Sequence, residues 1–152
     1  MAMDRLPKSL RVYIVEDSAI IRRLLVSTIE AAGATLLGQS IDAKTAIADL
    51  SVLQPDLILI DITLESGTGF DVLRALQEGG LAPNAIKAVL TNHADSRYEQ
   101  LSASLGAHRF LSKFSEMSQA LALIHALAAE KRSHCISRPG PDQPDTGRCR
   151  QD

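Results

Sequence analysis

The sequence contains no Trp, only 3% aromatic residues and only two Cys. Few side chains are therefore available to stack on the bases of single-stranded nucleic acid. Cys135 and Cys149 stand far apart in a polar stretch, which argues against a disulfide framework or a paired metal-ligand motif. The formal net charge of −2 argues in the same way against a strongly basic nucleic-acid binder.

Long apolar runs are absent as well, and none approaches the roughly 18 residues that a membrane span needs. The first residues include Asp4, Arg5, Pro7 and Lys8, and no small-residue cleavage site follows them, so they do not resemble a signal peptide. We therefore expect a cytoplasmic protein without a membrane segment, in a compartment where thiols stay reduced.

The 152 residues, of which 45% are apolar and 22% charged, are enough for one globular domain with its own core. Short apolar segments, typical of strands buried on both faces, alternate with amphipathic stretches of helical period. The five segments are Leu10–Val15, Ala34–Gly38, Leu57–Ile60, Ile86–Leu90 and Arg109–Leu111. This alternation predicts an α/β domain with a parallel sheet and helices on both faces.

Helix boundaries follow from local signals. Asp42 and Ser115 are good N-caps, whereas Gly33, Gly79 and Gly106 stand where helices should stop. The first helix should bury one apolar face, made of Ile20, Ile21, Leu24, Leu25 and Ile29.

The chain divides into three parts by composition. Residues 1–9 form an N-terminal extension and residues 10–131 the folded domain. We expect residues 132–152, which are rich in Pro, Gly, Arg and Asp, to form a disordered tail because they cannot bury enough apolar surface. About twenty residues are too few for a DNA-binding domain, so none is expected.

Polar side chains follow four of the five apolar segments. Glu16 and Asp17 follow the first, Asp61 the third, Thr91 the fourth and Lys113 the fifth. Each alone has an ordinary structural explanation, such as a helix cap or a surface charge. Because the carboxyl ends of parallel strands meet at one edge of a sheet, we expect these groups to lie together. Three carboxylates with one ammonium call for a further cation, and an all-oxygen site suits Mg²⁺.

Such a site is suited to phosphoryl chemistry. An Asp carboxylate can act as the nucleophile and carry an aspartyl-phosphate. A phosphate-cradling glycine loop is missing, since the first turn reads Glu16-Asp17-Ser18-Ala19. Nucleotide binding by a Rossmann or P-loop route is therefore not expected.

Four stretches together resemble the receiver domain of two-component response regulators. They are VEDSAIIRRLL (Val15–Leu25), LILIDITLESGTGFDVL (Leu57–Leu73), LTNH (Leu90–His93) and LGAHRFLSK (Leu105–Lys113). The resemblance covers roughly Leu10 to Glu130. It implies a doubly wound, five-stranded parallel sheet of order 2-1-3-4-5, the flavodoxin-like or CheY-like arrangement.

The resemblance also implies roles for individual residues. Asp61 would accept a phosphoryl group from a His of a sensor histidine kinase or a histidine phosphotransfer protein. The implied Mg²⁺ ligands are Glu16, Asp17, Asp61 and the backbone carbonyl of Thr63. Thr91 and Lys113 would contact the phosphoryl group, and Phe110 would turn inward as Thr91 moves.

We expect a single-domain response regulator that signals by protein contact or by passing the phosphoryl group on. Its downstream target would bind the face formed by the fourth helix, fifth strand and fifth helix. The chain would not be an enzyme beyond Mg²⁺-dependent self-phosphorylation and self-dephosphorylation.

The sequence departs from the family pattern in several places. Phe114 follows Lys113 where the family commonly has Pro, so the cis peptide usual there is not expected. Leu64 and Glu65 stand where Met-Pro is frequent, and Phe110 replaces a frequent Tyr. Asn92 is larger than the residue often found after the Thr, which should alter water access to the site.

Two other functions stay open. A small phosphohydrolase would form an aspartyl-phosphate on a similar sheet, but it often needs a second Asp where Thr63 stands. A receiver-like module could also bind partners without being phosphorylated.

Overall fold

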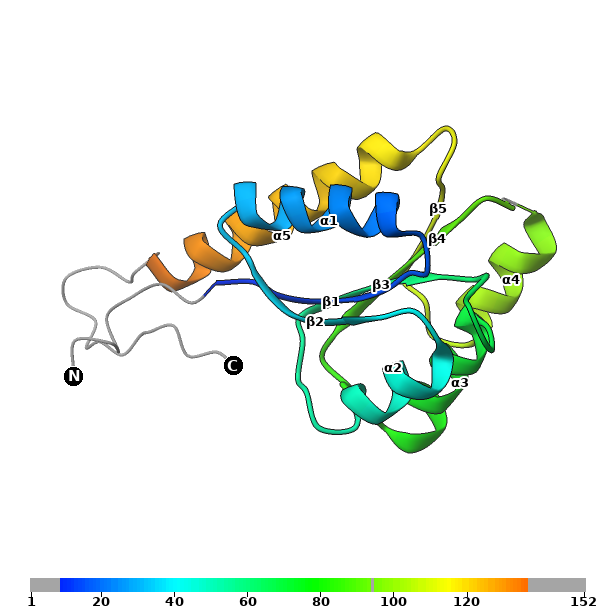
Figure 1. Ribbon diagram of the computed structural model, residues 1–152. Coiled ribbons are helices and arrows are strands. Elements are labelled where there is room, and N and C mark those ends of the chain that lie inside the picture. The colour runs from blue at the N-terminus through cyan, green and yellow to red at the C-terminus, as the bar shows by residue number, and fades with distance from the viewer. Residues whose placement is uncertain (1–8, 94, 137–152) are drawn as a thin grey trace.

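The computed structural model describes residues 9–93 and 95–136, with side chains up to Ser133. Within these ranges five strands alternate with five helices (Figure 1). The elements are β1 (Arg11–Val15), α1 (Ala19–Ala31), β2 (Thr35–Ser40), α2 (Ala43–Leu50), β3 (Leu57–Asp61), α3 (Gly69–Gly79), β4 (Ile86–Thr91), α4 (Ser96–Ser104), β5 (Arg109–Ser112) and α5 (Met117–Ile136). The predicted strands are confirmed, and β3, β4 and β5 each end one residue later than expected.

The strands form one parallel sheet of order β2-β1-β3-β4-β5. Helices α1 and α5 cover one face, and α2, α3 and α4 cover the other (Figure 1). The doubly wound fold implied by the resemblance is therefore confirmed. Strand β3 lies at the centre, paired with β1 on one side and β4 on the other, so its last residue, Asp61, has neighbouring strand ends on both sides.

Two apolar layers hold the helices to the sheet. Alternate residues of a strand point to opposite faces, so Tyr13, Ile58 and Ile60 join one core cluster while Ile14 and Leu59 join the other. Every residue of β3 is buried. This explains why the strand reads as a continuous apolar run rather than an alternating one.

Some local expectations are confirmed and others are wrong. The Asp42 side chain accepts from Thr45 N and caps α2, as predicted. Ser115 does not cap α5, which begins at Met117; its amide instead donates to Ser112 Oγ in a turn before the helix. Gly79 is the last residue of α3, and the left-handed residue that ends the helix is Gly80, with φ of 62°. Short-range propensity does not decide between two adjacent glycines.

The apolar face of α1 is narrower than expected. Leu25 and Ile29 are fully buried against the sheet, whereas Ile20 is 76% exposed and Leu24 is 39% exposed. The expectation of one shared face is wrong because Ile20 lies nine residues before Ile29, which at 3.6 residues per turn places the two side chains on roughly opposite sides of the helix.

The expected tail boundary at residue 132 is too early, because α5 continues to Ile136. Two contacts hold the end of this helix against the domain. Arg132 Nη1 donates to the carbonyl oxygen of Ala32 at 2.8 Å, and Lys131 Nζ lies 3.1 Å from Asp56 Oδ1. Residues 1–8 of the N-terminal extension and residues 137–152 of the expected tail lie outside the described residues. None of the described helices is long and apolar enough to cross a membrane.

Candidate acidic site at the carboxyl end of the sheet

Glu16, Asp17 and Asp61 meet where β1 and β3 end. One oxygen from each carboxylate lies within 4.8 Å of the other two. Val15 pairs with Ile60 in the parallel register, so the residues that follow them are brought side by side. The sequence predicted this convergence.

Lys113 joins the carboxylates from the far side of β4. Its Nζ lies 2.8 Å from Glu16 Oε1 and 3.2 Å from Asp61 Oδ2, and its side chain is only 7% exposed. Its backbone N–H donates to the carbonyl oxygen of Thr91 at 2.8 Å, which fixes the start of the loop at the end of β4. An ammonium is thereby held between two buried acids that come from different strands.

The cluster contains more negative than positive charge. Burial raises the pKa of Glu16 to about 7, although the hydrogen bond from Lys113 works in the opposite direction. Burial likewise raises the pKa of Asp61, and the charge of Lys113 offsets this only in part. Glu16 and Asp61 thus hold their negative charge at a cost, which either a proton or a bound cation can reduce.

The donor set fits a small divalent cation. Glu16 Oε2 accepts from Lys113 Nζ at 2.9 Å and from Ser18 N at 3.1 Å. Glu16 Oε1 is buried and, among the described residues, has no hydrogen-bond partner of good geometry, although it lies close to the same ammonium. A cluster of carboxylate oxygens in which three acids have one ammonium between them is the kind of site that binds Mg²⁺.

The loop after Asp61 bends tightly around the carboxylate. Thr63 N donates to Asp61 Oδ1 at 3.4 Å, and Thr63 forms an antiparallel bridge with Thr68. Gly69 begins α3 directly against the strand end, where a Cβ would collide with the carbonyl oxygen of Asp61. This close approach explains why residue 69, eight residues after Asp61, is a glycine.

Thr91 is the last residue of β4, beside the end of β3, whereas Phe110 lies further back along β5, paired with Val89. Thr91 is fully buried, and its Oγ1 accepts a hydrogen bond from His93 N at 3.0 Å. Phe110 is half-buried and packs against the core cluster on the side of α2 and α3. Within the described residues, no hydrogen bond joins the Thr91 side chain to the three carboxylates.

The loop after Lys113 is held by side chains in place of a proline. Ser112 N donates to Glu116 Oε1 at 2.8 Å, and Ser112 Oγ accepts from Phe114 N at 3.2 Å. The described residues contain no cis peptide bond, as expected for this loop. Phe114 itself is 81% exposed.

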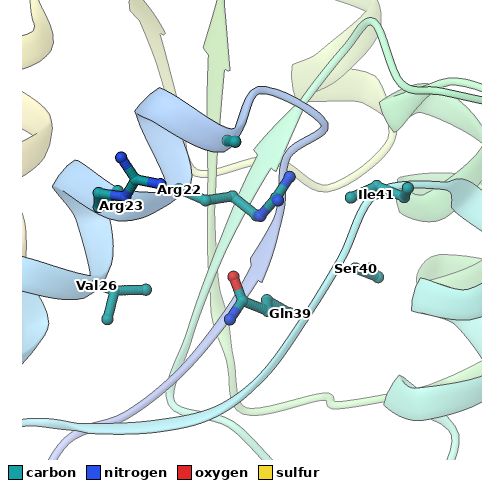
Figure 2. A pocket seen from close by; sticks show the side chains of 7 residues that line it. Arg22, Arg23, Val26, Gln39, Ser40 and Ile41 are labelled. Atoms are coloured by element: carbon teal, nitrogen blue, oxygen red, sulfur yellow. The ribbon is translucent and has the colours of Figure 1, made fainter.

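Arg22 has a structural role at the site that the sequence reading did not assign. Its Nη1 donates to the carbonyl oxygen of Glu16 at 2.9 Å, which ties the acidic loop to α1. Arg22 also lines a cavity of about 400 Å³ between α1 and β2, together with Arg23 and Gln39. Figure 2 shows the two arginine side chains pointing in different directions, with Arg22 extending across the cavity. The sequence shows an arginine near the acids but not which backbone group it reaches.

Residues 12–125 match the family model of the response regulator receiver domain. The chain belongs to this family. Receiver domains bind Mg²⁺ at an acidic pocket and interact with histidine kinases and downstream targets, and the cluster of Glu16, Asp17 and Asp61 is compatible with that metal.

Curated relatives support the membership over part of their own length. The receiver domain is 29% identical over 114 residues to a protein-glutamate methylesterase/protein-glutamine glutaminase of Desulfotalea psychrophila, covering 74% of this chain and 31% of that protein. It is 32% identical over 75 residues to the chemotaxis protein CheY of Thermotoga maritima, covering 49% of this chain and 61% of that one. The chain thus spans less than two thirds of each relative.

Solved structures share the fold. A CheY-like receiver domain protein from Methanospirillum hungatei superposes with a TM-score of 0.70 at 22% identity, covering 82% of this chain and 97% of that one. The signal receiver domain of the putative response regulator NarL from Mycobacterium tuberculosis superposes with a TM-score of 0.71 at 21% identity, covering 81% of this chain and 98% of that one.

Proposed function

We propose that this receiver domain accepts a phosphoryl group on Asp61 from a phosphohistidine of a sensor histidine kinase or a histidine phosphotransfer protein. The observation that carries the proposal is the position of Asp61: its side chain is 5% exposed and lies close to Lys113 and to the acids Glu16 and Asp17. A carboxylate with a purely structural role would have its charge balanced by neighbouring cations. Asp61 instead shares a single ammonium, that of Lys113, with Glu16.

In the proposed step, a carboxylate oxygen of Asp61 attacks the phosphorus atom of the donor. A P–O bond to Asp61 forms as the P–N bond to the donor imidazole breaks, and that nitrogen keeps the electron pair and takes up a proton. Lys113 Nζ, 3.2 Å from Asp61 Oδ2, would neutralise one phosphoryl oxygen. The hydroxyl of Thr91 would turn from His93 N to a second oxygen.

Glu16, Asp17 and Asp61 would hold Mg²⁺, with the carbonyl oxygen of Thr63 as a further ligand. Bound there, the metal would neutralise charge on the transferring group. Arg22 and Ser18 keep Glu16 in place, through its carbonyl oxygen and its carboxylate respectively.

The signal would leave through the face of α4, β5 and α5. Movement of Thr91 would let Phe110, now half-buried, turn inward and change this face. Tyr98 lies on it, partly exposed, with its ring 5.5 Å from that of Phe70 in an edge-to-face contact. A target that prefers one of the two packings would then be recruited or released.

The remaining expectations belong to the same proposal. They are a single-domain response regulator, a cytoplasmic location, and no enzymatic activity beyond Mg²⁺-dependent self-phosphorylation and self-dephosphorylation. Two alternatives differ from it in class: a phosphohydrolase that acts through an aspartyl-phosphate, and a module that binds partners without phosphate. Thr63 stands where such a hydrolase often has its second Asp, which favours the phosphoacceptor.

One experiment separates the three functions. The chain is incubated with Mg²⁺ and acetyl phosphate and examined by intact mass and on a phosphate-retarding gel. A single base-labile phosphoryl group, absent in Asp61→Asn, is the expected result. Rapid turnover of many phosphate esters would support the hydrolase, and no label together with no Mg²⁺ binding would support the phosphate-independent module.

A further inference from the structure

Backbone hydrogen bonds join the loop that follows Asp61 to the loop that precedes α2. Glu65 N donates to the carbonyl oxygen of Ile41 at 2.9 Å, and Ala43 N donates to the carbonyl oxygen of Ser66 at 3.0 Å. Leu64 and Ala43 are buried in the same core cluster. Two loops that are distant in sequence are therefore joined through both backbone and core, and the first of them carries Thr63.

Gly67 packs against the start of α2 with no room for a side chain. Its φ is +78°, and a Cβ at this position would lie 2.7 Å from the Cβ of Ala43. Real Cβ atoms essentially never come that close, so a side chain at residue 67 would have to move one of the loops. Ala43 is the first residue of α2 and is buried, so the β3–α3 loop is the partner more able to shift.

A shift at Gly67 would reach the acidic cluster through a short path. Thr63 lies four residues before Gly67 in the same loop and bridges to Thr68, and Thr63 N contacts Asp61 Oδ1. Thr68 also caps α3, where its side chain accepts from Asp71 N while the Asp71 side chain accepts from Thr68 N. The α3 side of the loop is thus fixed by a capping box, so the displacement would fall mainly on the segment with Thr63.

We propose that Gly67 is a positioning residue for cation binding at Glu16, Asp17 and Asp61. By allowing close contact with Ala43, it holds the loop of residues 62–68 where Thr63 can complete the ligand set. This inference rests on the proposed function, because it requires that the acidic cluster binds Mg²⁺. Gly67 acts through the loop and touches neither the cation nor the phosphoryl group.

The test compares Gly67→Ala with Gly80→Ala in the full chain. Gly80 is a matched control, because its φ of +62° imposes similar strain on alanine while an added Cβ meets no atom within 4 Å. A double variant, Ala43→Gly with Gly67→Ala, removes the colliding Cβ and keeps the strain at residue 67. The Mg²⁺ dissociation constant is measured from backbone amide chemical shifts during titration with MgCl₂, and hydrogen exchange is followed at the amides of Ala43 and Glu65.

We expect Gly67→Ala to weaken Mg²⁺ binding about tenfold, as loss of an outer-shell support commonly does, and to speed exchange at both amides. Gly80→Ala should keep the wild-type affinity, and the double variant should recover most of the loss. If Gly67→Ala does not fold, Ala43→Ser adds one atom at the same contact and should weaken binding in the same direction by a smaller factor.

Equal Mg²⁺ affinity in Gly67→Ala and Gly80→Ala would overturn the inference, as would a double variant no better than Gly67→Ala. In both cases the wild type would still bind Mg²⁺, so the proposed function would stand. A wild type whose amide shifts do not respond to MgCl₂ would instead overturn the proposed function and this inference with it.

Discussion

Strand β3 has an aspartate at each end, and the two carboxylates lie in opposite electrostatic surroundings. Asp56, just before the strand, lies 3.2 Å from Arg11 Nη2 and 3.1 Å from Lys131 Nζ. Asp61, the last residue of the strand, shares Lys113 with Glu16 and has Asp17 nearby. Among the described residues, one carboxylate therefore faces two cations at the first end, whereas three carboxylates face one cation at the second.

The pKa values move in opposite directions at these two ends. Burial would raise the pKa of Asp56, but hydrogen bonds from Arg11 and Lys131 outweigh it and lower the pKa. Burial raises the pKa of Asp61, and Lys113 does not outweigh it. Charge balance, more than the presence of an acid, thus distinguishes a structural ion pair from a site that can take a cation.

Removing the single cation of the acidic site should have the largest effect. Lys113→Met leaves Glu16 and Asp61 buried without their cation, and such a loss commonly costs about 3–5 kcal/mol. Lys131→Met is the matched control, since its partner Asp56 keeps Arg11, and it should cost less than about 1 kcal/mol. Urea unfolding at pH 8 with EDTA measures both free energies. Equal losses would contradict the contrast between the two ends.

Mg²⁺ should stabilise the protein by binding at the acidic site, at the carboxyl end of β3, and not at the Asp56 end. At about 100 times the dissociation constant, a ligand that binds only the folded state adds about 2.7 kcal/mol, which thermal unfolding with and without MgCl₂ will report. Asp17→Asn should lose this stabilisation, and Asp56→Asn should keep it. A response that survives in Asp17→Asn would show that the cation binds elsewhere.

The pH dependence of stability should have opposite signs at the two ends. Because the Glu16 pKa is raised to about 7, the folded state binds its proton more tightly than the unfolded state. In EDTA the contribution of Glu16 to the unfolding free energy therefore falls as the pH rises from its ordinary value of 4.5 through about 7. Glu16→Gln should flatten this part of the curve of unfolding free energy against pH. Urea unfolding between pH 5 and pH 8 measures both curves, and parallel curves for the wild type and Glu16→Gln would contradict a raised Glu16 pKa.

For Asp56 the sign is reversed and the effect is the smallest of the four. Its pKa is lowered, so its stabilisation is present above the unfolded pKa and is lost as the pH falls through the folded value. Asp56→Asn should reduce stability by about 1–2 kcal/mol at pH 7 and by less at pH 3. Urea midpoints at the two pH values measure this, and an equal loss at both would contradict it.

The acidic site was predictable because strand order in a parallel sheet turns a sequence pattern into a spatial cluster. Glu16, Asp17, Asp61 and Lys113 each follow a recognisable apolar segment, and the fold brings those segment ends together. Contacts across the fold leave no such pattern. Nothing local in the sequence indicates that Arg22 reaches the carbonyl oxygen of Glu16.

Helix ends were less predictable for a related reason. Lys131 and Arg132, near the end of α5, contact Asp56 and Ala32, which are remote in sequence. Periodicity and local propensity describe one element at a time, so they miss features that two elements decide together.

The most direct test is to determine which aspartate, at which end of β3, carries the phosphoryl group. The chain is labelled with acetyl phosphate and Mg²⁺, the acyl phosphate is reduced with borohydride, which converts a phosphorylated aspartate to homoserine, and the peptides are sequenced by mass spectrometry. Homoserine at position 61, with Asp56 and Asp17 unchanged, is the predicted result. Homoserine at any other position, or at none, would contradict the assignment of Asp61 as the phosphoacceptor.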